Sequence, residues 1–133
     1  MNSKKMGLLF AVSIAMAVAA APAFAQDSPQ RKEIKRADLS GAPGMEVINS
    51  VSEYNPGEEI GLHIHHGVES GYFIQGGTVQ SPGKQPMVVP DGAPILNLRG
   101  VPHAGFKVVG DKTLKIFTVH IVDKGKPLYD YVK

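Results

Sequence analysis

Two histidines and a glutamate lie close together in the segment from Gly57 to Gly76. His63 and His65 are two residues apart, and in a β-strand that spacing places both imidazoles on one face. Glu69 follows four residues after His65, past an expected turn, so it can return on a neighbouring strand toward the same point. Two imidazoles and a carboxylate suit a first-row transition metal such as Fe(II), Mn(II), Ni(II) or Zn(II). The segment therefore predicts a metal site.

A further histidine, His103, ends a later segment that begins at Gly92. Together the two segments resemble the two sequence motifs of the cupin superfamily. The first motif, G-x5-H-x-H-x3-4-E-x6-G, is matched at each fixed position, by Gly57, His63, His65, Glu69 and Gly76. The second motif, G-x5-P-x-G-x2-H-x3-N, is matched by Gly92, Gly100 and His103, whereas Leu98 replaces the proline and Lys107 replaces the asparagine.

The cupin resemblance implies a ligand set and a range of activities. In the family, the two histidines and the glutamate of the first motif and the histidine of the second bind one divalent transition metal. Here the implied ligands are His63, His65, Glu69 and His103. Cupins with this ligand set include metal-dependent dioxygenases, oxalate-degrading enzymes and isomerases, and other cupins bind sugars or small effectors without catalysis. The chain resembles the small single-domain cupins, whose substrates vary widely. A barrel that has lost its metal and only binds a ligand is the alternative.

The first 25 residues are expected to be a secretory signal peptide and not part of the fold. Two lysines precede an apolar run from Gly7 to Ala21, and Ala23-Phe24-Ala25 is an A-x-A cleavage site that leaves Gln26 as the first mature residue. A transmembrane anchor is the alternative, but the run is short for the roughly 20 residues that span a bilayer. The lysines and the alanine-rich run are typical of bacterial export. We therefore expect a periplasmic or secreted protein with no membrane attachment after cleavage.

Composition limits the classes of function. The chain has 133 residues, which allows one domain, and it has no cysteine, which excludes disulfides and thiol chemistry. Two of the 14 basic residues belong to the leader, so the mature chain carries equal numbers of basic and acidic residues, and its charge gives no support to nucleic-acid binding. A charged cluster from Arg31 to Arg36 precedes the strand pattern. Residues 26–38 are therefore expected to form a flexible, solvated N-terminal arm.

The remaining residues, 39–133, are expected to form one β-domain. Short runs of branched and aromatic residues alternate with turn residues, and no stretch shows a sustained helical period. Many short strands separated by regular turns indicate an all-β barrel or sandwich. The resemblance narrows this fold class to the small jelly-roll (cupin) barrel. The longer expected strands cover residues 45–54, 60–65, 69–74, 103–109 and 114–122.

Alternation along these strands selects candidates for a substrate pocket. Phe73 and Gln75 share the inward face with Glu69, and Lys107 shares the face of His103 if that strand is regular. Phe73 could form a wall of the pocket, although an aromatic residue in a barrel is more often plain core. Lys107 could attract an anionic substrate, although a side chain that extends to the barrel rim is the simpler interpretation.

The two remaining histidines are expected to have other roles. His66 falls on the opposite face from His65, so we expect it in a loop at the mouth of the barrel. His120 lies on the same strand face as Leu114. There a hydrogen-bonded structural role is expected instead of a fifth ligand position.

One strand face predicts an oligomer. Ile60, Leu62 and Ile64 lie opposite the histidines of the first motif, so they form an apolar outer face that should not meet water. A second subunit or the chain's own N-terminal strand could cover this face, and a homodimer is the favoured interpretation.

The sequence leaves three functions open. The first is a secreted metal-dependent enzyme of the dioxygenase type that acts on a small molecule. The second is a non-catalytic periplasmic cupin that binds or senses a small molecule. The third is a structural barrel within a complex, which would contain no metal. The sequence does not name the metal or the substrate.

Overall fold

The computed structural model describes residues 27–133, so the predicted signal peptide and Gln26 lie outside the described residues. Every regular element in the described range is a β-strand, and the range contains no helix long and apolar enough to cross a membrane. The predicted all-β class is confirmed. The strands are β1 (Arg31–Asp38), β2 (Met45–Tyr54), β3 (Glu59–Ile60), β4 (His63–Ile64), β5 (Gly67–Gln75), β6 (Gly77–Gln80), β7 (Met87–Val89), β8 (Pro94–Asn97), β9 (Phe106–Val109), β10 (Leu114–Asp123) and β11 (Asp130–Tyr131).

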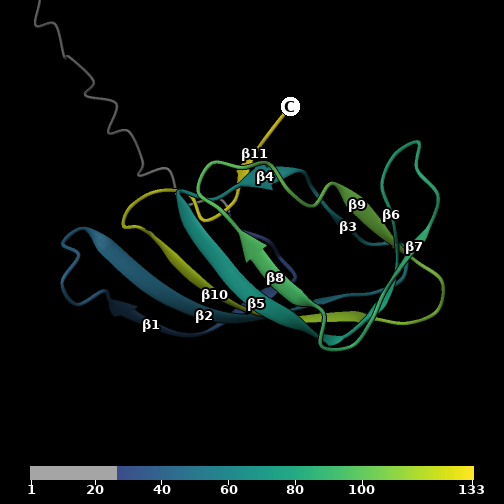
Figure 1. Cartoon of the computed structure of the whole chain (residues 1–133), viewed down its shortest axis with the longest axis horizontal. Coiled ribbons are helices and arrows are strands. Elements are labelled where there is room, and N and C mark those ends of the chain that lie inside the picture. Colours follow the sequence, from purple (N-terminus) through teal and green to yellow (C-terminus); the bar gives the residue numbers. More distant parts are fainter. Residues whose placement is uncertain (1–26) are drawn as a thin grey trace, which may run out of the picture.

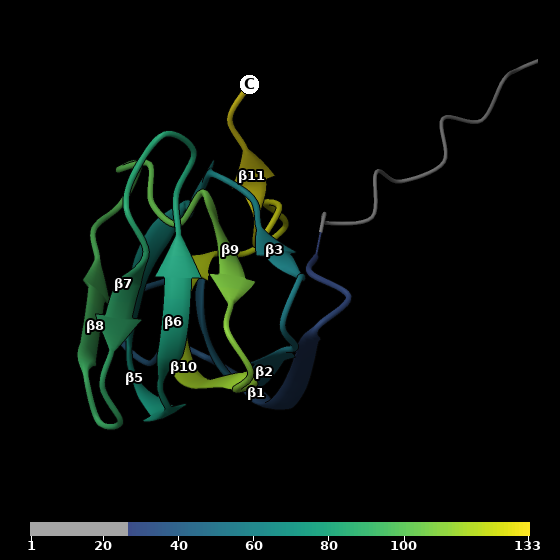
Figure 2. The same cartoon turned by 90° about the vertical axis from the view of Figure 1, so that its right-hand side faces the viewer.

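Nine of these strands form two antiparallel sheets that face each other, and β4 and β11 form a separate two-stranded sheet. The larger sheet has the order β1-β2-β10-β5-β8, and the smaller has the order β3-β9-β6-β7. Figure 1 shows the larger sheet below, with the smaller sheet and the short β4–β11 pair above it. In Figure 2, β6 and β9 face the viewer, and strands of the larger sheet lie behind them. This arrangement is the predicted jelly-roll barrel.

The inward face of the central strands changes character along its length. In β2 and β10 the burial alternates residue by residue, as expected for strands with one face on the core. Apolar inward residues gather into one cluster that includes Tyr54 and Leu114 and a second that includes Ile48 and Val122. Between the two clusters the inward positions are polar and buried, namely Ser50, Ser52, Thr118 and His120. The barrel therefore has a polar middle between two apolar ends.

The expected flexible arm is wrong over residues 31–38, which form strand β1 at the edge of the larger sheet. The strand pairs with β2 in a register that runs from Arg31 opposite Ser52 to Asp38 opposite Glu46. Its side chains are mostly exposed, so backbone hydrogen bonds to β2 hold it in place. A charged edge strand resists unwanted pairing with other chains. Because this kind of strand buries little apolar surface, its composition resembles that of a solvated arm.

Arg31 is the exception on β1. Its side chain is 4% exposed, its Nη1 donates to Ser50 Oγ at 2.6 Å, and its guanidinium forms an ion pair with Asp27. A buried guanidinium requires such partners, because an unpaired charge in the interior is costly. The strand therefore belongs to the barrel, which begins before residue 39.

The expected apolar outer face is also wrong, because the first motif strand is interrupted. Strand β3 ends at Ile60 and β4 begins at His63, and the two residues between them lie outside any strand. This break shifts the alternation, so that Ile60 (8% exposed) and His63 (3% exposed) both face the interior. Leu62 is 41% exposed, and Ile64 is partly buried. The three residues therefore do not form one exposed apolar surface. The homodimer stays a prediction, but this face is not its interface.

The break in the strand predicts unequal effects of two similar truncations. We expect Ile60→Ala to lower the free energy of unfolding by about 2–5 kcal/mol, because it opens a cavity in the core. Leu62→Ala, the matched control two residues away, should lower it by less than about 1 kcal/mol, because much of that side chain is already in water. Urea denaturation of both variants measures the difference. Equal losses would mean that the two side chains share one environment.

Candidate metal centre

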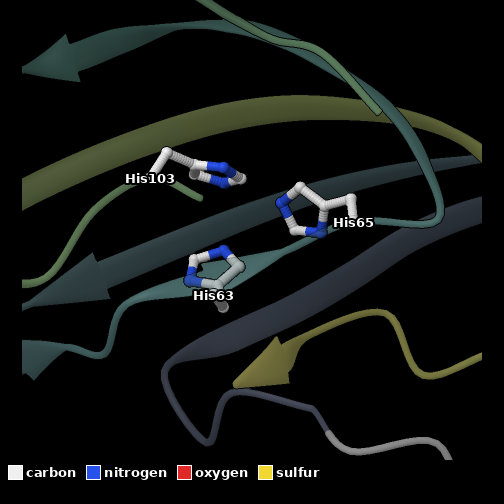
Figure 3. Close-up of side chains that lie close together, drawn as sticks. All are labelled: His63, His65 and His103. Atoms are coloured by element: carbon white, nitrogen blue, oxygen red, sulfur yellow. The ribbon is translucent and has the colours of Figure 1, made fainter. Parts of the chain in front are cut away.

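The three motif histidines meet inside the barrel although they come from distant parts of the chain. His63 lies in β4, His65 follows that strand, and both are almost fully buried. His103 joins His63 through two backbone hydrogen bonds, from His63 N to His103 O at 3.2 Å and from His103 N to His63 O at 3.0 Å. Figure 3 shows the three rings close together. Their centroids are 4.4–4.8 Å apart. The structure therefore brings together the histidines that the motifs selected.

A backbone carbonyl contacts the Nδ1 atom of each of these three rings. The acceptors lie at 2.7 Å from His63, 2.5 Å from His65 and 2.9 Å from His103. A carbonyl oxygen only accepts, so each Nδ1 carries the proton and each Nε2 keeps a free lone pair. This arrangement orients an imidazole for metal binding. The three carbonyls belong to Gly61, Leu128 and Val101.

Glu69 brings a buried carboxylate to the same rings from strand β5. Its Oε2 lies 3.3 Å from His65 Nε2 and 3.4 Å from His103 Nε2, and Asn97 Nδ2 donates to the same oxygen at 2.6 Å. The side chain of Glu69 is about nine-tenths buried. The carboxylate is therefore held in place on the donor side of the rings.

The cluster holds an ionised carboxylate beside two imidazoles, those of His63 and His103, whose pKa values are shifted in opposite directions. Burial would raise the pKa of Glu69, but contacts with His103, His120 and His65 outweigh burial and hold that pKa well below its usual range. Burial lowers the pKa of His63 to about 4. Burial would also lower the pKa of His103, but the carboxylate of Glu69 and the Val101 carbonyl raise it above its usual value. The Glu69 carboxylate is therefore negatively charged and can offset the charge of a cation. Of His63 and His103, His103 holds a proton more readily.

These residues fit a divalent transition metal. Donor atoms of His63, His65 and His103 all lie within 4.8 Å of one another. The Nε2 atoms of His65 and His103 are buried and have no hydrogen-bond partner among the described residues. Buried polar atoms are normally satisfied, so their free lone pairs point to a ligand that completes them. The cluster can therefore hold a divalent transition metal, and its imidazole and carboxylate donors are of the types that bind Fe, Mn, Ni and Zn.

The other two histidines differ from each other. His66 lies outside the cluster, 29% exposed, with its Nε2 at 3.1 Å from Asp130 Oδ2. His120 is buried, and neither of its ring nitrogens has an aligned hydrogen bond among the described residues, so the expected hydrogen-bonded role stays a prediction. Its Nε2 lies 3.3 Å from Glu69 Oε1. Alternation along its strand indicated that it faces inward, but only the cross-strand register places it beside the carboxylate.

A cavity of about 340 Å³ adjoins the cluster. His63, Glu69 and His103 form one part of its wall, and Phe73 lines it as expected. In the part of the chain that the structure describes, no lysine or arginine lines this cavity. The remaining wall is mostly aromatic and aliphatic with a few hydroxyl and amide groups, from Ser52, Tyr54, Ile60, Pro94, Ile95, Leu96, Asn97, Ala104, Phe106, Ile116, Thr118 and Tyr129.

Two expected pocket residues do not line this cavity. Lys107 is exposed on β9 and pairs with Glu59 at 3.2 Å, because the left-handed conformations of Ala104 (φ 64°) and Gly105 (φ 71°) break the alternation after His103. Gln75 donates from Nε2 to the Thr113 carbonyl at 2.6 Å. A register irregularity in the β5–β10 pairing next to Gln75 removes it from the pattern that Phe73 follows.

Comparison with known proteins identifies the fold. No family model matches this chain, and no curated protein matches it. Among solved structures, the polyketide cyclase RemF from Streptomyces resistomycificus is 20% identical over 75% of this chain and 80% of that chain, with a TM-score of 0.52. A cupin-like protein from Thermotoga maritima is 20% identical over 77% of this chain and 74% of that chain, with a TM-score of 0.51. At this level of identity the likeness shows the fold, which is that of the small cupins.

The opposite pKa shifts predict that two neighbouring histidines titrate far apart in the metal-free protein. We expect His103 to take up a proton above pH 6.5 as the pH falls, and His63 to stay neutral until about pH 4. Because protons compete with a metal for the imidazoles, metal affinity should begin to fall as the pH drops through the raised pKa of His103. NMR titration of the imidazole C–H signals measures both values. Coincident titration of the two rings near pH 6.5 would contradict the prediction.

Proposed function

We propose that this small cupin is a secreted metalloenzyme of the dioxygenase type, with one divalent transition metal held by His63, His65, Glu69 and His103. The observation that carries the proposal is the set of buried Nε2 atoms that have no partner and lie beside an ionised carboxylate at the wall of a cavity. Export to the periplasm is supported by the leader pattern in the sequence.

The residues around the donors prepare them for their role. Backbone carbonyls fix the three rings with Nε2 free, so little reorganisation is needed when a ligand binds. Asn97 holds Glu69, which supplies negative charge to offset that of a cation. When bound, a divalent transition metal supplies Lewis acidity, and a redox-active one can also activate dioxygen. Four protein ligands leave about two positions of an octahedral ion for other molecules.

The cavity wall favours a small, uncharged and largely apolar substrate. Phe73, Phe106 and Ile116 provide apolar surface that a hydrocarbon or aromatic body can cover. Thr118 Oγ1 is buried without a hydrogen-bond partner among the described residues, so it is free to bind a polar substituent. A carboxylate or phosphate away from the donor cluster would meet no lysine or arginine in this wall and would lose its hydration without compensation. The expected substrate therefore has an uncharged body that fits the cavity. It would also have two adjacent oxygens that a metal held by the four donors could bind.

Oxygen consumption tests this proposal. Protein loaded anaerobically with Fe(II), Mn(II) or Ni(II) is mixed with aerated solutions of uncharged catechols and enediols, and with their carboxylated analogues in parallel. We expect uptake of dioxygen with the uncharged compounds and at least about tenfold less with the carboxylated ones, because the wall offers no counter-ion.

Two variants separate the site from the rest of the protein. Glu69→Ala should abolish oxygen uptake and lower metal affinity more than about 100-fold, beyond the 10–100-fold usual for residues that only support a ligand. His66→Ala should leave both unchanged, because that ring lies outside the cluster. Binding of a compound without oxygen uptake under any of the three metals would instead identify a binding or sensing protein.

A further inference from the structure

His120 is a buried histidine that the proposed metal site does not use. It lies on β10, the strand between β2 and β5, and the register of the β5–β10 pair places it directly opposite Glu69. The residue is fully buried, and its ring centroid lies 4.7 Å from that of His65 and 6.3 Å from that of Tyr129. A polar ring in this position requires an explanation, because buried nitrogens are rarely left unpaired.

The two oxygens of Glu69 face different neighbours. Oε2 is the oxygen near His65 and His103, and Asn97 donates to it. Oε1 is the oxygen near His120, with 3.3 Å between Oε1 and Nε2. At that distance the two atoms are in contact but do not yet form an aligned hydrogen bond. The carboxylate thus presents one oxygen to the three-histidine cluster and the other to His120.

The surroundings of Nδ1 distinguish His120 from the other three rings. Each of those rings donates from Nδ1 to a backbone carbonyl, which leaves Nε2 free to bind a metal. Nδ1 of His120 is buried and has no hydrogen-bond partner within residues 27–133. If His120 bound a metal through Nε2, its Nδ1–H would be a buried donor without a partner, which folded proteins avoid. If the proton is instead on Nε2, that N–H faces the Glu69 carboxylate. Only the lone pair of Nδ1 is then left without a partner.

We propose that His120 is a positioning residue for Glu69 and not a fourth histidine ligand. It donates from Nε2 to Oε1, and so directs Oε2 toward His65 and His103. This inference rests on the proposed metal site. In this role, His120 determines which oxygen of Glu69 faces the three-histidine cluster.

The number of histidines that bind Co(II) tests the inference in the native protein. In a Co(II)-loaded sample, each coordinated imidazole with a protonated distal nitrogen gives a strongly shifted, exchangeable N–H signal in the ¹H NMR spectrum. We expect three such signals, from His63, His65 and His103. Four signals would overturn this inference alone, whereas a protein that takes up no Co(II) would overturn the proposed metal site together with it.

Two substitutions at residue 120 test the direction of the hydrogen bond. His120→Gln keeps an N–H donor at nearly the same reach, and His120→Leu removes it. We expect Co(II) affinity, measured by competition with a chelator, to fall about 10–100-fold in His120→Leu and less than about threefold in His120→Gln. His66→Leu is the matched control and should match the native protein. Equal losses of Co(II) affinity in the two residue-120 variants, or no loss in either, would overturn the positioning role. If His120→Leu does not fold, the number of shifted N–H signals in the native protein decides the question.

Discussion

The pair of backbone hydrogen bonds between His63 and His103 is the contact on which the site depends. Forty positions separate the two residues in the sequence, and this bridge holds their rings 4.4 Å apart. Only the closure of the two sheets into a barrel brings the two chain segments alongside. His65 follows His63 on the same segment, so the bridge brings all three residues together, and the carbonyls of Gly61, Leu128 and Val101 orient their rings. The fold and the donor cluster are therefore consequences of the same strand arrangement.

The cost of this arrangement is a polar barrel interior. A buried carboxylate is unfavourable unless it is paired, and Glu69 has Asn97 and three imidazoles around it. The inward positions of β2 and β10 are polar in the middle of both strands, next to Glu69. The larger sheet therefore has a smaller hydrophobic core there. The apolar clusters on either side supply the stability. Such a division between a rigid apolar frame and a polar centre is what a ligand-binding barrel requires.

The sequence predicted the features that depend on local spacing or on whole motifs. It identified the all-β jelly roll and the grouping of His63, His65, Glu69 and His103. It did not predict features set by irregular backbone or by pairing between distant strands. Left-handed residues at positions 104 and 105 turned Lys107 outward, and a break after β3 turned Ile60 inward. For His120 the sequence predicted a hydrogen-bonded role but not that Glu69 lies beside it, because that neighbour is fixed by cross-strand register and not by spacing.

The metal content of the protein as isolated from its own cells tests the central claim most directly. The protein is purified without chelators or added metal, and elemental analysis is combined with a mass measurement that identifies the mature chain. The account predicts about one divalent transition metal for each chain, bound by the four residues of the cluster. Protein that is folded, correctly matured and still essentially free of transition metal would contradict it.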